Sequence, residues 1–138
     1  MDLAAALEFA TTHHRSVLST IRRNGRPQLS NVTHGVADGT LRISITADRA
    51  KYHNLVREPW AALHVTDENF GRWAVVEGPV ELTAIAADPH DEAVEALVAY
   101  YRDLSGEHPD WDDYRAAMVR DRRVLARIRP DHAYGQLG

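Results

Sequence analysis

The sequence predicts a mainly β fold with flanking helices (α+β), in which six antiparallel strands form a closed or nearly closed barrel. Two observations support this fold class. Segments of alternating apolar and polar residues are separated by short hairpin signals, and helical patterns lie between or beside these segments. A barrel also removes the strand edges that such segments would otherwise expose. The 138 residues are expected to form a single domain over 1–138, large enough to bury one core.

The first elements are one helix and two strands. Apolar residues recur at helical spacing over residues 2–11, which predicts an amphipathic helix. The β-branched, alternating segment 16–21 predicts a strand. Asn24-Gly25 follows it, and this dipeptide is the strongest short-range hairpin signal, typical of a type I′ turn. Residues 28–36 are the predicted return strand.

A second hairpin and a short helix come next. Asp38-Gly39 predicts another tight turn, and residues 40–46 alternate as the third strand. Asp48 can cap a short helix that Pro59 prevents from continuing.

The second half contains two strands, two helices and a last strand. Gly78-Pro79 interrupts a long strand and predicts a bulge or bend. Asp88-Pro89 predicts an N-cap followed by proline at the first helical position. The predicted elements are strands over 60–66 and 72–85, helices over 88–104 and 110–121, and a strand over 123–129.

Composition excludes several classes of function. A net charge of −4 without a basic stripe gives no reason to expect nucleic acid. The chain has no cysteine, which excludes disulfides and thiolate metal sites and suits a cytoplasmic protein. No signal sequence and no apolar run of membrane-spanning length occurs. The eight histidines show no paired ligand spacing, so no metal site is expected.

Arg49 and Lys51 are the strongest candidates for ligand binding. Lys51 is the only lysine, whereas arginine occurs fifteen times. Both cations lie at the start of the predicted short helix, where backbone N–H groups already favour an anion. Cations there oppose the helix dipole, so a compensating phosphate or carboxylate is expected.

Two strand segments carry polar side chains that also suit a ligand. Gln28 and Ser30 alternate with Leu29, and Asn31 is a poor strand former that can hydrogen-bond to a ligand edge. Ser44 and Thr46 point to one face of their strand.

These segments, in this order, resemble a known family. The stretches VLSTIRRNGRPQLSNV, LRISITADRAKYHNLVREP and WAVVEGPVEL are similar to the flavin reductase-like split β-barrel of the pyridoxamine 5′-phosphate oxidase superfamily. More closely, they resemble its actinobacterial branch that uses the deazaflavin coenzyme F420. The C-terminal stretch VEALVAYYRDLSGEHPDWDDYRAAMVRDRRVL is also similar to that branch, so the resemblance covers nearly the whole chain.

The resemblance implies a homodimer with two identical cofactor sites at the subunit interface. Lys51 and Arg49 would contact the F420 phosphate, residues 44–46 would face the cofactor, and residues 28–31 would run along its ring. Additional cations for its poly-glutamate tail would come from Arg57, Arg72 and residues 120–123. The implied cofactor-binding residues are Gln28, Leu29, Ser30, Asn31, Ser44, Ile45, Thr46, Arg49, Ala50, Lys51, Asn54, Trp73 and Ala74.

The implied function is that of an F420-dependent oxidoreductase, which transfers a hydride from the reduced deazaflavin to a small organic acceptor. Two alternatives stay open: an F420-binding protein with little turnover, and a reductase or oxidase that uses FMN on the same fold. A phosphate anchor alone does not separate F420 from FMN, because both carry one. No residue stands out as a catalytic proton donor, and the sequence does not identify the acceptor.

Overall fold

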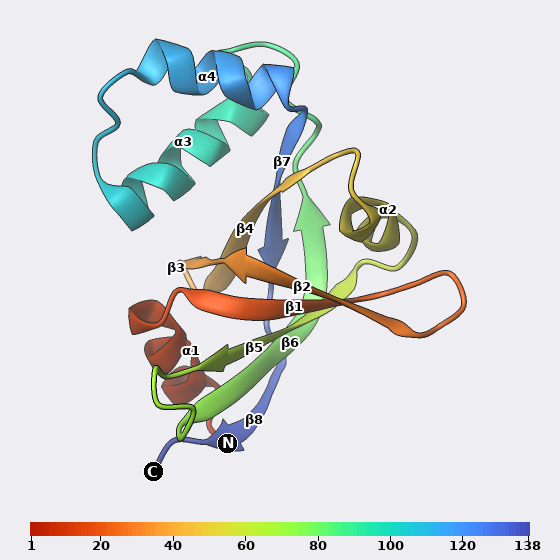
Figure 1. Cartoon of the computed structure of the whole chain (residues 1–138), viewed down its shortest axis with the longest axis vertical. Helices are drawn as coiled ribbons and strands as arrows, with labels where there is room; N and C mark the ends of the chain where they lie inside the picture. Colours follow the sequence, from red (N-terminus) through yellow and green to blue (C-terminus); the bar gives the residue numbers. More distant parts are fainter.

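The computed structural model describes residues 1–138 and contains four helices and eight strands (Figure 1). The fold is an antiparallel half-barrel with flanking helices, so the predicted fold class is confirmed. The elements in order are α1 (Leu3–Thr12), β1 (Arg15–Ile21), β2 (Pro27–Thr33), β3 (Gly35–Ala37), β4 (Thr40–Thr46), α2 (Ala50–Arg57), β5 (Trp60–Thr66), β6 (Trp73–Leu82), α3 (Glu92–Ser105), α4 (Trp111–Arg120), β7 (Arg123–Ile128) and β8 (His132–Gln136).

The strands form one curled sheet in the order β2-β1-β5-β6-β7-β4-β3, with β8 paired to β6. The two strands at the ends of this order, β2 and β3, are consecutive in the chain and separated only by His34. The sheet therefore curls until its two edges meet, which is how this fold limits exposed strand edges.

β6 changes its partner in the middle. Its first half pairs with β8 over Trp73–Glu77, and its last residues pair with β7 over Val80–Leu82. The change falls at Gly78-Pro79, where the sequence predicts a bulge or bend. A Cβ on Gly78 would lie 2.2 Å from the carbonyl oxygen of Arg129, so glycine allows this close crossing.

The structure has two more strands than the six that the sequence predicts. The predicted strand 28–36 divides into β2 and β3 at His34, whose backbone N–H donates to the His14 carbonyl. β8 was not expected, because its sequence HAYGQ has only a weak strand pattern. Backbone pairing with β6 forms it.

The two hairpins use different turns from one another. Asp38 and Gly39 have φ of 53° and 73°, as a type I′ turn requires. In the first hairpin only Gly25 has positive φ, at 84°, and its N–H bonds to the Arg22 carbonyl. The predicted type I′ turn at Asn24-Gly25 is therefore wrong: the loop is a three-residue type I turn closed by a left-handed glycine.

Two predicted helix caps are also wrong. The N-cap of α2 is Arg49, which makes no side-chain capping bond, rather than Asp48. The N-cap of α3 is Asp91 rather than Asp88, because Asp91 Oδ1 accepts the N–H of Val94 at 2.9 Å. Asp2 and Asp110 cap α1 and α4 through similar bonds of 3.1 Å.

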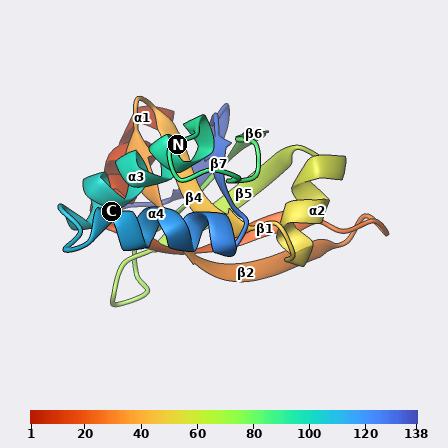
Figure 2. The same cartoon turned by 90° about the horizontal axis from the view of Figure 1, so that it is seen from above.

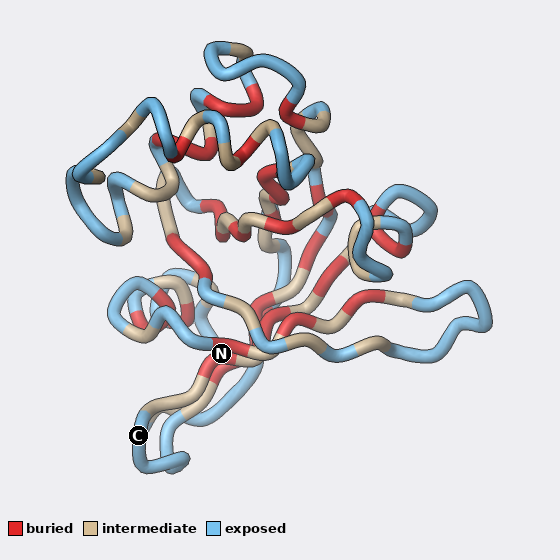
Figure 3. The backbone as a smooth tube through the Cα atoms, turned by 45° about the horizontal axis from the view of Figure 1, so that its top comes forward, coloured by how far each residue is buried: buried red, intermediate tan, exposed pale blue.

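The core has two parts. The larger lies inside the half-barrel and is covered by Ala6, Phe9 and Ala10 of α1. The smaller lies between β7 and the α3–α4 pair, which sits over one end of the sheet (Figure 2). The β1–β2 hairpin extends away from the body, and its tip is exposed (Figure 3). None of the helices is long and apolar enough to cross a membrane.

Candidate functional site

The start of α2 carries two cations, Arg49 and Lys51, with the acidic Asp48 just before the N-cap. Its first turn contains no acidic residue, and the Arg49 N-cap leaves the helix N–H groups without a side-chain acceptor. Lys51 is half-buried, and burial, followed by the charges of Arg49 and Arg123, lowers its pKa. A bound anion would stabilise the charged form of Lys51, because it would offset the neighbouring cations.

These cations line a polar pocket of about 440 Å³. It contains two arginines, one lysine and no carboxylate, and none of these three side chains belongs to an ion pair. The lining residues are Asn31, Val32, Thr33, Ser44, Ile45, Thr46, Arg49, Lys51, Tyr100 and Arg123. Three unpaired cations in a protein of net charge −4 make this pocket suited to a multiply charged anion.

Arg123 supplies the third cation from β7. Thr46 and Arg123 are directly opposite in the β4–β7 ladder, so both side chains point into the pocket. Arg123 Nη1 lies 3.4 Å from both the carbonyl oxygen and the hydroxyl oxygen of Ser44. Its Nε is buried and has no hydrogen-bond partner.

Tyr100 closes the pocket from α3. Its hydroxyl donates a hydrogen bond of 2.8 Å to the Thr33 carbonyl. Burial raises the pKa of Tyr100, which keeps the phenol neutral and able to donate. Tyr100 is not among the residues that the sequence singled out, because it reaches the pocket through the packing of α3. Arg123 belongs to the group 120–123 that the resemblance implied as tail-binding cations, and it lines this pocket with Arg49 and Lys51.

The structure brings together about half of the residues that the sequence singled out. Asn31, Ser44, Ile45, Thr46, Arg49 and Lys51 line one pocket. Ile45 is only 1% exposed and its side chain belongs to the core, so it can offer backbone atoms alone. Ala50 is exposed at the start of α2 and does not line the pocket.

Gln28 and Asn54 bond to each other instead of facing this pocket. Asn54 Nδ2 donates to Gln28 Oε1 at 3.0 Å and to Thr20 Oγ1 at 3.1 Å. Asn54 Oδ1 accepts from Arg57 at 3.1 Å. Buried Asn54 therefore ties α2 to the β1–β2 hairpin and fixes the direction from which α2 presents its N-terminus.

A larger, mostly apolar hollow of about 970 Å³ lies on the outer face of β2, β1, β5, β6 and β8. Its lining residues are Arg15, Ser16, Val17, Ser19, Leu29, Asn31, Val32, Thr33, Trp60, Ala62, His64, Thr66, Phe70, Val75, Glu77 and Tyr134. Asn31, Val32 and Thr33 line both spaces, so the cationic pocket and the apolar hollow share a wall on β2.

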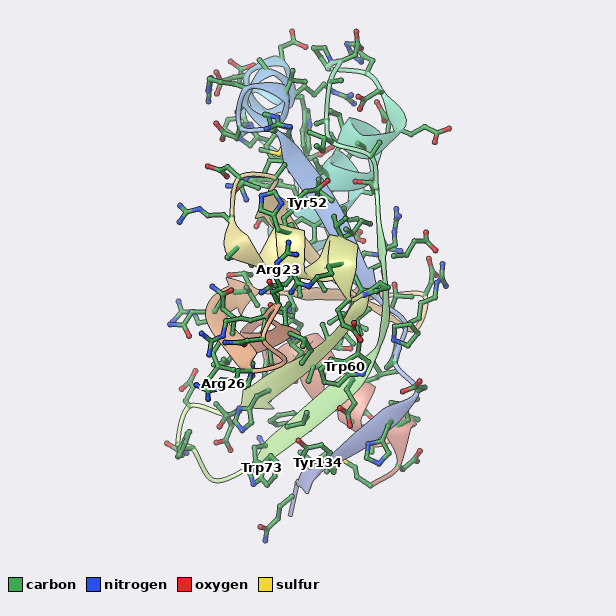
Figure 4. The ribbon with its side chains drawn as sticks, turned by 90° about the vertical axis from the view of Figure 1, so that its right-hand side faces the viewer. Arg23, Arg26, Tyr52, Trp60, Trp73 and Tyr134 are labelled. Carbon is green, nitrogen blue, oxygen red and sulfur yellow. The ribbon has the colours of Figure 1, made fainter.

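The remaining candidates are divided between this face and the core. Leu29 points into the hollow and is 66% exposed, whereas Ser30 points to the opposite face of β2. Trp73 lies beside Tyr134 (Figure 4), edge-on to it with ring centroids 6.1 Å apart. Its ring also stacks on that of His64, which lines the hollow, at 5.5 Å. Ala74 is fully buried in the core, so it cannot contact a ligand through its side chain.

Comparison with protein families identifies one match along almost the whole chain. A family model described as "Pyridoxamine 5′-phosphate oxidase" matches residues 3–136.

Three solved structures illustrate the range of proteins that share this fold. A conserved hypothetical protein from Mycobacterium tuberculosis has a TM-score of 0.76 and 22% identity, over 99% of this chain and 85% of that one. An F420 reductase has a TM-score of 0.68 and 24% identity, over 92% and 94%. HutZ, a heme storage protein from Vibrio cholerae, has a TM-score of 0.71 and 15% identity, over 100% and 98%. At such identities these similarities establish the fold alone.

Proposed function

Since this chain belongs to the pyridoxamine 5′-phosphate oxidase family, we propose that it is an oxidoreductase that binds coenzyme F420 and reduces a small, flat organic acceptor. The observation that carries the proposal is the arrangement of two adjoining spaces. A pocket with three unpaired cations shares the wall Asn31–Thr33 with a large apolar hollow. A molecule with a phosphate at one end and a flat ring system at the other fits both spaces at once.

The residues that line the two spaces suit a cofactor with a phosphate and a flat ring system. Arg49, Lys51 and Arg123 would hold the phosphate, since charged hydrogen bonds to phosphate are short and strong. Asn31 would hydrogen-bond to the ring edge, because its side chain lies where the two spaces meet. When bound, the reduced deazaflavin supplies the hydride.

The apolar walls have a role of their own. Val17, Leu29, Ala62 and Val75 line the hollow, so an acceptor there would lie largely away from water. Exclusion of water strengthens the electrostatic interactions that orient an acceptor and protects a reduced product from side reactions.

We also propose that two copies of the chain associate through this sheet face. Leu29 is 66% exposed and Phe70 is 78% exposed at the rim of the hollow, although both are large apolar residues. A second copy would cover this rim and enclose the floor of the hollow. Light scattering at micromolar concentration should give the mass of a dimer, whereas a monomer mass would contradict this arrangement.

Fluorescence titration tests the cofactor. F420, a tail-less deazaflavin and FMN are titrated at low and high salt, and the tryptophans report binding. F420 should bind more tightly than FMN, and this preference should weaken at high salt, because carboxylates of the tail contact exposed cations that salt screens beyond about 8 Å. Equal affinity for FMN at low salt would favour the FMN-dependent reading.

Lys51→Ala tests the anchor. A hydrogen bond between a cation and phosphate contributes roughly 1.5 to 3 kcal/mol, so F420 affinity should fall about tenfold to a hundredfold. Arg129→Ala is the matched control, since Arg129 is exposed, pairs with Glu81 at 3.3 Å and lies outside the pocket. An assay of reduced F420 oxidation with a panel of acceptors then shows whether the protein is an enzyme or a binding protein with little turnover.

A further inference from the structure

Lys51 carries the one side-chain amine of this protein, and this amine has no anionic partner. The sequence contains a single lysine, so the only other amine is the α-amino group of Met1. Lys51 belongs to no ion pair, and no carboxylate lines the pocket in which it lies. Because Lys51 is half-buried, its ammonium form has also lost part of its contact with water.

The charged groups that line the pocket with Lys51 are both cations. Arg49 comes from the N-cap of α2, and Arg123 comes from β7. Tyr100 of α3 is the other titratable lining residue, and burial raises the pKa of its phenol, which is therefore neutral. Asp48 precedes the N-cap, but it is exposed and does not line the pocket. Burial and the charges of Arg49 and Arg123 lower the pKa of Lys51, which increases the fraction of neutral, nucleophilic amine.

The same pocket offers donors to a small anion. Ser44 and Thr46 of β4 line it with their neighbours from α2. Thr46 lies opposite Arg123 in the strand ladder, and Arg123 Nη1 lies 3.4 Å from the Ser44 hydroxyl oxygen. An anionic group attached to Nζ of Lys51 would therefore have guanidinium and hydroxyl donors beside it, in a space of about 440 Å³.

We propose that Lys51 is a site of reversible carbamate formation with carbon dioxide, and that the carbamate, held by Arg49 and Arg123, excludes phosphate from the pocket. The modification converts three neighbouring cations into two cations and one anion, so it removes the repulsion between Lys51 and the two arginines. Carbamate formation depends on the pocket alone, whereas its effect on F420 binding rests on the proposed function.

The step needs no oxidant, reductant or further reactant. The lone pair of the neutral Nζ of Lys51 forms a bond to the carbon of carbon dioxide. One C=O electron pair moves onto oxygen, and a proton leaves Nζ for solvent. The product is an N-carboxylate, which accepts charge-assisted hydrogen bonds from guanidinium groups as any carboxylate does. Acidification reverses the reaction, because it returns the proton to the nitrogen and releases carbon dioxide.

Chemical trapping detects the carbamate directly. The protein is equilibrated with isotope-labelled bicarbonate and treated with triethyloxonium ion, which ethylates the carbamate oxygen, and its peptides are then analysed by mass spectrometry. The peptide that contains Lys51 should carry the label, and the labelled fraction should increase with carbon dioxide pressure and reach saturation. The α-amino group of Met1, which is 46% exposed and outside the pocket, is an internal reference. An unlabelled Lys51 peptide overturns the proposal.

Substitution of the arginines tests whether the pocket is responsible. In Arg123→Gln the labelling of Lys51 should fall about fivefold or more, as for loss of one partly exposed ion pair, while the labelling of Met1 is unchanged. Arg129→Gln is the matched control, because Arg129 is exposed and lies outside the pocket, and its labelling should equal that of wild type. Equal labelling of Lys51 in Arg123→Gln and wild type overturns the proposal.

A second variant keeps the test decisive if Arg123→Gln is unstable to heat. Arg49 is exposed and makes no side-chain capping bond, so Arg49→Gln should leave the fold intact and still reduce the labelling of Lys51. Inorganic phosphate should suppress the labelling of Lys51 and leave that of Met1 unchanged. Labelling that phosphate does not affect overturns the exclusion of phosphate by the carbamate.

F420 titration separates this inference from the proposed function. Bicarbonate should weaken F420 binding to wild type but not to Lys51→Arg, which has a cation but no amine, when chloride holds the ionic strength constant. Tight F420 binding by a protein whose Lys51 carries no label overturns the carbamate and leaves the proposed function in place. Labelling of Lys51 in a protein that binds no F420 supports the carbamate and overturns the proposed function.

Discussion

Acidification should destabilise this protein through His34, which joins the end of α1 to the strands. The imidazole is fully buried: Nε2 lies 2.9 Å from the Ala10 carbonyl, and Nδ1 lies 2.8 Å from the Ser16 hydroxyl. Burial, together with the charges of His14 and His13, lowers the pKa of His34 from 6.5 to about 4, although the bond to Ala10 opposes this shift. The folded protein therefore contains the neutral imidazole of His34.

The sign and size of the effect follow from linkage. Because the folded pKa lies below the unfolded value, the unfolded chain binds the proton more tightly, and stability is fully present above the unfolded pKa. Stability is lost as the pH falls from 6.5 toward 4. With 1.36 kcal/mol per pKa unit, the loss between pH 7 and pH 5 is about 2 kcal/mol, and the limit at still lower pH is about 3 kcal/mol.

Urea unfolding at several pH values between 7 and 5 measures this loss. His34→Gln should be less stable at pH 7, by about 1 to 3 kcal/mol, because buried partners are left unpaired. Its stability should then be nearly independent of pH across this range, whereas wild type and the exposed control His53→Gln should each lose about 2 kcal/mol. Equal slopes for wild type and His34→Gln would refute the assignment of this pH dependence to His34.

Two further substitutions test the close contacts that shape the site. Gly78→Ala places a Cβ 2.2 Å from the Arg129 carbonyl oxygen, so the free energy of unfolding should fall by about 2 kcal/mol. Gly71→Ala is the control and should cost far less, because a Cβ there meets nothing within 4 Å. Similar urea midpoints for the two variants would contradict a steric clash at Gly78. Tyr100→Phe removes the hydrogen bond to the Thr33 carbonyl, so the free energy of unfolding should fall by about 1 kcal/mol. Affinity for a phosphate ligand should fall only a few-fold. A loss of affinity as large as that in Lys51→Ala would show that the phenol contacts the ligand directly.

Local patterns in the sequence were sufficient for most of the fold. Strands 40–46 and 60–66 have the predicted bounds, because alternation and turn residues mark both ends of each. One failure occurred where a tertiary contact decides, because β8 exists only as a partner of β6. The cap of α3 was misplaced for a local reason: Asp91, rather than Asp88, accepts the backbone N–H groups of Ala87, Asp88 and Val94.

The candidate site was accessible from the sequence only in part. Arg49 and Lys51 could be found because they lie together at one helix start. Tyr100 could not, because its place in the pocket depends on how α3 packs. Arg123 was expected only among the tail-binding cations of residues 120–123, and the pairing of β4 with β7 places it beside Arg49 and Lys51. Conversely, Asn54 has the right spacing for a ligand contact, yet its amide is used within the fold by Gln28 and Thr20.

The pairing of β4 with β7 also determines when the anion pocket can form during folding. Thr46 and Arg123 are paired although α2, β5, β6, α3 and α4 separate them in the chain. Closing so long a loop is slow, since its entropy is lost before its contacts are gained. A nascent chain should therefore bind no anion there until β7 has docked. A ligand of this pocket should slow unfolding without speeding folding, because it binds only after β4 and β7 have paired.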